Sequence, residues 1–465
     1  MPEESNRKRS LFLVAGPLLG LTLAAAAGAT FDLDFDALAC VFVTALCATW
    51  WVTEAIPIPA TSLIPFAAFP LLGVLDHTGV STAYGHSLIL LLLGGFMLST
   101  AMEKSGAHHR VAMAMVRLVG GAGGPRLILG FMVASAVLSM WISNTATVLM
   151  LLPVALAVID QANDDTLDRP LLLGIAYAAS IGGIGTPVGT PPNVILMGVF
   201  TEKTGREIAF AEWMQFGLPI VFVFLPLAWL WLSRNVNRNA QPLELPPSTP
   251  WSAAEKRVLF IFFVTALAWV TRTAPFGGWA KAFGITGTGD ATVALAAVVV
   301  MFLVPTGNDD GERLLDWKTA SSIPWGLLLL FGGGLAIAKA FDRSGLSTTL
   351  GQTLSGLASW PLIPMVLLIA LTVTFVTEVT SNTATTSLLM PILAPAAIAA
   401  GLDPLLMMAP AAISASCAFM LPVATAPNAI VFGTGKLTTR DMSSEGFILN
   451  LGGAFLITAA CAILL

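Results

Sequence analysis

The pentapeptide Ser-Asn-Thr-Ala-Thr occupies residues 143–147 and recurs without a change at residues 381–385. Both copies lie in apolar stretches, where Ser and Asn are poor helix formers because their side chains compete for backbone hydrogen bonds. A single buried hydroxyl usually bonds to a neighbouring helix, but two identical strings at equivalent places favour a functional role. We therefore interpret each copy as a break in a helix.

The two copies belong to a longer duplication. Three motifs occur in the same order in both halves, with offsets of 239, 238 and 235 residues. The first motif is Gly-Gly followed by Lys104-Ser105-Gly106 in one half and by Arg343-Ser344-Gly345 in the other. The second is the pentapeptide, and the third is Pro192-Asn193 in one half and Pro427-Asn428 in the other. The sequence thus predicts two homologous repeats, which we expect to be inverted relative to each other.

The chain between these motifs is strongly apolar. Of the 465 residues, 56% are hydrophobic and 11% are charged, whereas soluble proteins carry about 25% charged residues. Residues 11–31, 55–75 and 127–159 carry no charge, and a transmembrane helix needs about 20 such residues. We predict an all-α polytopic membrane protein with about eleven transmembrane helices and two re-entrant hairpins.

Glycines and basic residues suggest how these spans are arranged. The stretches 87–101 and 323–341 contain Gly94-Gly95 and Gly332-Gly333-Gly334, so we interpret them as the two hairpins. Positive charges favour the cytoplasmic side, which predicts a cytoplasmic N-terminus at Arg7-Lys8-Arg9 and a cytoplasmic linker at 233–256. The linker divides the two halves.

The motifs carry groups suited to both a cation and an anion. Asn, Ser and Thr side chains can serve either, unwound backbone exposes carbonyl oxygens to hard cations, and helix N-termini present N–H groups to anions. The Gly- and Pro-rich segments 183–193 and 421–428 would add free backbone groups. Neither motif contains Arg or Lys, so a bound dianion would need co-bound cations. Two breaks could hold two sodium ions and both ends of a dicarboxylate, near the bilayer midplane where repeats meet.

Glu378 is a carboxylate within the second motif region. Its equivalent in the first repeat is Met140. An intramembrane carboxylate is a functional candidate, either as a proton carrier or in a supporting or helix-capping role. We favour the supporting role.

The chain resembles the divalent-anion/sodium symporters, a group with bacterial succinate carriers and animal dicarboxylate and citrate transporters. The resemblance runs from about residue 10 to the C-terminus. Its matching pieces are Trp50-Trp51-Val52-Thr53-Glu54-Ala55-Ile56-Pro57, both Ser-Asn-Thr motifs, Gly189-Thr190-Pro191-Pro192-Asn193 and residues 416–428. One departure is Ala426, where the first repeat has Pro191.

The resemblance implies a homodimer in which each protomer has a scaffold and a transport domain and works by an elevator mechanism. The implied divisions are scaffold helices 1–86, repeat 1 at 87–232, the linker 233–256, scaffold helices 257–322 and repeat 2 at 323–465. The first sodium site would comprise Ser139, Ser143, Asn144 and Gly189, and the second Thr377, Thr380, Asn382 and Ala424. Substrate carboxylates would meet Asn144, Thr145 and Thr190 on one side and Asn382, Thr383 and Thr425 on the other.

The sequence hypothesis is therefore sodium-coupled symport of C4-dicarboxylates such as succinate, malate or fumarate, across the inner (plasma) membrane. Sodium-independent exchange and proton coupling through Glu378 remain alternatives, and the hydroxyls of Ser139 and Thr377 favour sodium. A channel would need a lined pore with weak multi-site binding. No nucleophile–base–acid set appears, so we do not expect an enzyme. We also expect no nucleic-acid partner.

Overall fold

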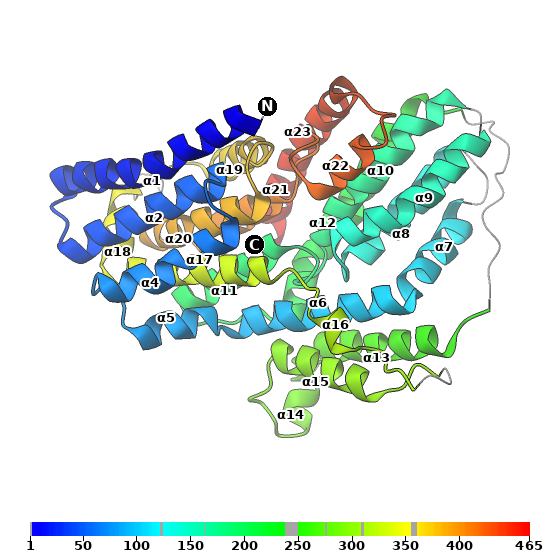
Figure 1. The fold of residues 1–465 in the computed structure, drawn as a ribbon, viewed down its shortest axis with the longest axis horizontal. Helices are drawn as coiled ribbons and strands as arrows, with labels where there is room; N and C mark the ends of the chain where they lie inside the picture. Colours follow the sequence, from blue (N-terminus) through cyan, green and yellow to red (C-terminus); the bar gives the residue numbers. More distant parts are fainter. Residues whose placement is uncertain are drawn as a thin grey trace.

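The computed structural model describes residues 2–120, 124–162, 164–237, 250–274, 277–307, 311–354 and 360–465. Within these ranges the regular secondary structure is helical, apart from an isolated bridge between Pro305 and Arg313 (Figure 1). Eight of the described helices are long and apolar enough to cross a membrane. These features confirm the prediction of an all-α polytopic membrane protein. Residues 238–249 of the predicted linker lie outside the described ranges.

The helix order follows the duplication predicted from the motifs. The N-terminal helices are α1 (Pro2–Phe31), α2 (Phe35–Thr53), α3 (Ile58–Thr61), α4 (Ile64–Leu71) and α5 (His77–Tyr84). The first half continues with α6 (Ser87–Ser105), α7 (Ala107–Gly120), α8 (Gly124–Ser139), α9 (Asn144–Ala162), α10 (Asp165–Gly183), α11 (Pro191–Thr204) and α12 (Phe210–Leu232). The second half repeats that series as α17 (Trp325–Arg343), α18 (Leu346–Leu354), α19 (Leu362–Val376), α20 (Asn382–Ala399), α21 (Leu405–Ala415), α22 (Ala426–Phe432) and α23 (Thr439–Leu464).

A third group of elements lies between the two series. It consists of η1 (Ser233–Asn235), α13 (Ala253–Val270), α14 (Gly278–Ala282), α15 (Asp290–Leu303) and α16 (Trp317–Ala320). Figure 1 shows α13, α14 and α15 below the main body, and α15 packs along α6. This group therefore contacts the first repeat at one edge of the molecule.

The prediction that residues 87–101 and 323–341 form hairpins is wrong. Residues 87–101 lie within helix α6 and residues 325–341 within helix α17, and both helices run through their glycines without a break. The glycines serve close packing instead. A Cβ on Gly94 would lie 2.6 Å from the Cβ of Ala294, and one on Gly333 would lie 2.9 Å from the carbonyl oxygen of Ser62. Gly therefore marks helix contacts here, because any side chain would force the elements apart.

The helix interruptions that matter occur at the Ser-Asn-Thr motifs. The chain turns at residues 140–143 between α8 and α9, and at residues 377–381 between α19 and α20. Both helices of the first pair pack against α10, and both helices of the second pair pack against α21. The hairpins of this fold are thus α8–α9 and α19–α20, each with the motif at its tip.

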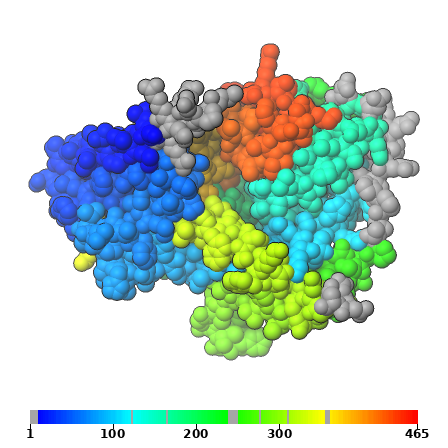
Figure 2. Space-filling view, viewed as in Figure 1, coloured from blue at the N-terminus to red at the C-terminus, as the bar shows by residue number. Residues whose placement is uncertain are grey.

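The two repeats also pack into each other. Helix α11 packs against α20 and α21, while α22 packs against α9 and α10. Figure 2 shows the same association from outside, with the orange C-terminal helices lying against the teal helices of the first repeat. Each repeat thus places the start of one short helix beside the hairpin of the other, and all four chain breaks come together.

Candidate functional site

Each Ser-Asn-Thr motif begins a helix. The Oγ of Ser143 accepts a hydrogen bond from the backbone N–H of Ala146 at 3.1 Å, and the Oγ of Ser381 accepts one from Ala384 at 3.5 Å. In both motifs the serine is therefore the N-cap. The first N–H groups of a helix have no partner within the helix and carry partial positive charge, which favours a bound anion.

The helices that follow the hairpins are broken. Helix α10 ends at Gly183 and α11 begins at Pro191, while α21 ends at Ala415 and α22 begins at Ala426. The Gly- and Pro-rich stretches between them leave backbone groups without helical partners. This confirms the prediction that these segments interrupt a helix.

One asparagine stabilises each break. The Nδ2 of Asn193 donates to the carbonyl oxygens of Gly183 and Thr186 at 2.9 and 2.8 Å. Asn428 makes the equivalent two bonds, to the carbonyl oxygens of Ala418 and Leu421, both at 3.0 Å. The Pro-Asn motif was found in the sequence as a repeat marker, but its structural role became visible only from these contacts.

Oxygen atoms gather in the same way behind each motif. The Oγ of Ser139 lies within hydrogen-bond distance of the Oδ1 of Asn144 and 2.7 Å from the carbonyl oxygen of Ala179. In the second repeat, the Oγ1 of Thr377 lies 2.7 Å from the Oδ1 of Asn382 and 3.2 Å from the carbonyl oxygen of Ala415.

Each cluster contains more acceptors than protons. A hydroxyl has one hydrogen, and both of its neighbours here can only accept. One close oxygen–oxygen contact in each cluster is therefore left without a proton. A hard cation bound by the two oxygens would remove the repulsion between them. Ser139 and Thr377 are fully buried, so bulk water does not reach these contacts. The clusters are candidate cation sites.

Gly183 is a site residue that sequence analysis missed. A Cβ at this position would lie 3.1 Å from the carbonyl oxygen of Gly189 and 3.3 Å from the Oδ1 of Asn144. Two oxygens predicted as ligands of one sodium ion thus converge over the bare backbone of Gly183. Its equivalent in the hydrogen-bond pattern of the second repeat is Ala418.

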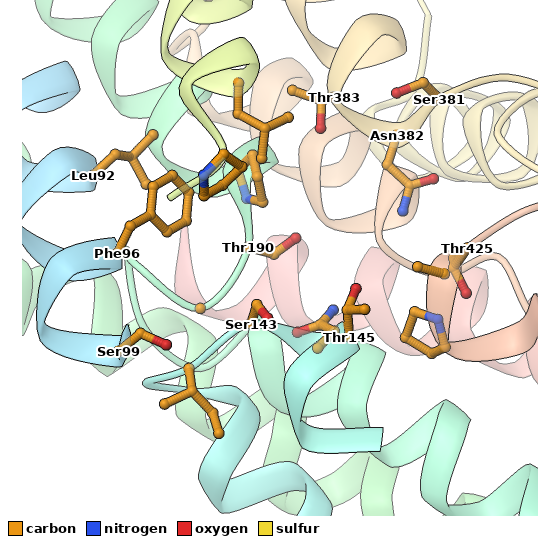
Figure 3. Close-up of a pocket in the computed structure, with 18 of the residues that line it drawn as sticks. Leu92, Phe96, Ser99, Ser143, Thr145, Thr190, Ser381, Asn382, Thr383 and Thr425 are labelled. Carbon is orange, nitrogen blue, oxygen red and sulfur yellow. The ribbon is translucent and has the colours of Figure 1, made fainter. Parts of the chain in front are cut away.

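A cavity of about 720 Å³ lies between the two sets of breaks (Figure 3). All six residues predicted to bind substrate line it, together with most of the predicted ion ligands. These lining residues are Asn144, Thr145, Thr190, Asn382, Thr383 and Thr425, with Ser143, Gly189, Thr380 and Ala424. Leu92 and Phe96 of α6 also line it (Figure 3), as do Trp51, Ile323 and Pro324. The predicted residues are therefore brought together, although their individual roles stay predictions.

The threonines of the cavity differ in what their hydroxyls contact. The hydroxyls of Thr145, Thr190 and Thr383 make no hydrogen bond with the described residues, so they are free to meet a ligand. The Oγ1 of Thr425 accepts a bond from the N–H of Asn428 at 3.2 Å.

Thr380 is a predicted ion ligand whose hydroxyl makes contacts outside the second cluster. Its hydroxyl bonds to the carbonyl oxygen of Val376 at 2.9 Å and to the Oγ1 of Thr385 at 2.7 Å. No hydrogen bond joins it to Thr377 or Asn382 in the described structure.

The positive potential of the cavity comes from the backbone, and the lining also includes the carboxyl groups of Glu54 and Glu103. Within the described part of the chain, its lining contains no Lys, Arg or His. Positive potential is supplied instead by the N-termini of α9 and α20, which begin at the two motif asparagines. The cavity is thus suited to an anion with a group at each end, bound together with cations.

Comparison with known proteins assigns the family. A family model described as "Citrate transporter" matches residues 48–412. The chain belongs to this citrate transporter family. It is accordingly a multi-pass membrane transporter and not an enzyme.

Individual relatives agree with this assignment. The sodium-dependent dicarboxylate transporter SdcS of Staphylococcus aureus strain RF122 / ET3-1 is 42% identical over 467 residues, covering 96% of this chain and 89% of the relative. The protein of the same name from strain NCTC 8325 / PS 47 matches with the same identity and coverage. Among solved structures, the YdaH transporter of Alcanivorax borkumensis shares the fold, with a TM-score of 0.61, 16% identity and 98% coverage of both chains.

Proposed function

We propose that this citrate-family member is a sodium-coupled symporter of C4-dicarboxylates such as succinate, malate or fumarate. The observation that carries the proposal is the pair of proton-deficient oxygen clusters behind two helix N-termini that border one cavity. The sodium-dependent dicarboxylate transporters from Staphylococcus aureus, 42% identical to this chain, support the same substrate and coupling ion.

The two repeats would divide the ligands between them. The first sodium ion would bind at Ser139, Ser143, Asn144 and Gly189, and the second at Thr377, Thr380, Asn382 and Ala424. One substrate carboxylate would meet Asn144, Thr145 and Thr190, and the other would meet Asn382, Thr383 and Thr425. The sodium charges neutralise the dianion, so the loaded cavity crosses the low-dielectric membrane at lower electrostatic cost.

The wider architecture is proposed on the same basis. The hairpins α8–α9 and α19–α20 would be the two re-entrant segments among about eleven transmembrane helices. The divisions 1–86 and 257–322 would form a scaffold, and the two repeats would supply a transport domain that moves as an elevator in a homodimer. The protein would lie in the inner membrane with a cytoplasmic N-terminus, because Arg7, Lys8 and Arg9 precede the first span.

Uptake into proteoliposomes tests the proposal. Labelled succinate should enter when a sodium gradient is imposed at fixed pH, and should not enter when a pH gradient is imposed without sodium. Uptake driven by the pH gradient alone would establish proton coupling instead. Sodium-independent uptake that requires unlabelled dicarboxylate inside the vesicles would establish an exchanger.

A further inference from the structure

Glu378 is a buried carboxylate, 4% exposed, on the turn between α19 and α20. Its Oε1 accepts a hydrogen bond from the backbone N–H of Met420, and its Oε2 accepts one from Leu421, both at 2.9 Å. The Nδ2 of Asn450 on α23 donates to the same Oε1 at 2.7 Å. The Oδ1 of Asn450 in turn accepts from the N–H of Phe419 at 3.2 Å. Three consecutive amides are thus held by two side chains.

These amides lie in the break between α21 and α22, where no helix supplies acceptors. Buried N–H groups without an acceptor are costly, so the break needs such a partner to keep its shape. The turn that carries Glu378 also carries Thr377, and the break continues to Ala424 and Thr425. Glu378 therefore connects the turn that carries the Thr377 hydroxyl to the break that carries Ala424, the backbone ligand proposed for the second site.

The first repeat makes this link differently. Met140 stands where the second repeat has Glu378, and its carbonyl oxygen accepts from the hydroxyl of Thr186. The Nε1 of Trp213 donates to the carbonyl oxygen of Ile184 at 2.9 Å. Neutral hydrogen bonds thus hold the first break, one from the hydroxyl of Thr186 and one to the carbonyl oxygen of Ile184, whereas a carboxylate holds the second break through its amides.

We propose, on the basis of the sodium-coupled function proposed above, that Glu378 is a positioning residue for the second cation site. With Asn450 it fixes the shape of the break that carries Ala424, whose carbonyl oxygen is the backbone ligand proposed for that site. It acts through the backbone and does not touch the substrate. Sodium affinity at the second site depends on this contact, while the first site is independent of it.

The Glu378→Gln variant tests this role in the full-length protein. Glutamine keeps one acceptor oxygen but points an NH₂ group at a backbone N–H, so two donors face each other. The half-saturating sodium concentration for succinate uptake should rise roughly tenfold, as expected for the loss of one buried hydrogen bond. The KM for succinate at saturating sodium should stay close to the wild-type value.

A rescue and a matched control separate positioning from general damage. Asn450→Asp combined with Glu378→Gln lets the new amide donate to the new carboxylate, which still accepts from Phe419. The double variant should recover part of the sodium affinity that each single variant loses. Glu255→Gln is the control, because Glu255 is also a buried carboxylate, 6% exposed, and glutamine can serve in its capping box with Ser252. Its sodium dependence should be that of the wild type.

Sodium binding can also be followed without transport, as the rise in Tm of purified protein when sodium chloride replaces choline chloride. The rise should be smaller in Glu378→Gln and unchanged in Glu255→Gln. Sodium-independent uptake by the wild type would refute the proposed function, and this binding comparison would then decide the positioning role by itself. If Glu378→Gln does not fold, Asn450→Ala removes one bond to the carboxylate together with the acceptor of the Phe419 N–H, and it should also lose sodium affinity. Wild-type sodium half-saturation and Tm rise in the folded variant, or a loss of maximal rate alone, would overturn the proposal.

Discussion

At the scale of single residues, the motif side chains could be predicted and their partners could not. Asn144 and Asn382 stand out in the sequence because each lies in a polar motif repeated inside apolar segments, and polar residues at such places usually have a function. Gly183 carries no such mark, and Asn193 stands out only as part of a repeated Pro-Asn pair whose contacts the sequence does not show. Their roles depend on backbone oxygens brought together by the break, and a contact between distant atoms leaves no trace in one sequence.

Gly183→Ala tests the first cation site at this scale. The added methyl group would lie 3.1 Å from the Gly189 carbonyl oxygen and 3.3 Å from the Asn144 Oδ1, so these oxygens must shift by a few tenths of an ångström. We expect sodium affinity to fall, roughly up to tenfold if the shift weakens one oxygen ligand. Sodium dependence of succinate uptake measures it.

Gly174→Ala is the matched control for that substitution. Gly174 is buried on the same helix, α10, but an added Cβ meets only the side chains of Met132 and Ile128. Flexible side chains can move aside, so sodium affinity should be retained. Equal sodium affinity in both variants would show that Gly183 does not border a cation site.

At the scale of elements, the duplication and the broken helices were predictable, but the place of the hairpins was not. Glycine pairs inside apolar stretches suggested breaks at α6 and α17, whereas both are continuous helices. A glycine that permits close packing looks the same in sequence as one that permits a turn. Residues 127–159 read as one uncharged span, yet the chain turns at residues 140–143 because Ser143 caps a new helix.

Asn193→Asp and Asn428→Asp test what holds the breaks open. Aspartate has nearly the same shape but lacks the NH₂ group that bonds to two carbonyl oxygens in each repeat. Its charge would instead repel those oxygens. Each variant should lose most succinate uptake per folded molecule, as shown by transport normalised to monodisperse protein. Asn235→Asp, at an exposed position, should behave as the wild type. Normal uptake by both buried variants would mean that the breaks keep their shape without these bonds.

At the scale of the whole molecule, the site exists only where the two repeats meet. Of the 32 residues that line the cavity, 15 come from the first repeat and 13 from the second, so any movement between the repeats would separate the two ends of the substrate site. An ion-pair cluster joins them away from the cavity. Arg234, just after α12, donates from both terminal nitrogens to the carboxylate of Glu445 on α23, at 2.8 and 2.9 Å. Arg169 on α10 approaches the same carboxylate at 3.4 Å and pairs with Asp441 at 2.7 Å.

Arg234→Ala should therefore weaken the association of the two repeats. The side chain of Glu445 is only 5% exposed. Removing its bidentate partner, Arg234, leaves the Glu445 carboxylate with only the longer contact to Arg169. Because Glu445 is buried but Arg234 is partly exposed, the loss should fall between the less than about 1 kcal/mol of an exposed pair and the about 3 kcal/mol or more of a fully buried pair. In thermal unfolding of the purified protein, the Tm of Arg234→Ala should be well below that of the wild type.

Two further variants serve as controls. The Tm of Arg234→Lys should lie between those of Arg234→Ala and the wild type, since lysine keeps the charge but not the paired geometry. Arg206→Ala, which breaks the exposed pair with Glu212, should change Tm little. Because none of these residues lines the cavity, the KM for succinate of the protein that remains folded should not move. Equal melting of Arg234→Ala and Arg206→Ala would show that the repeats are held together by their apolar contacts alone.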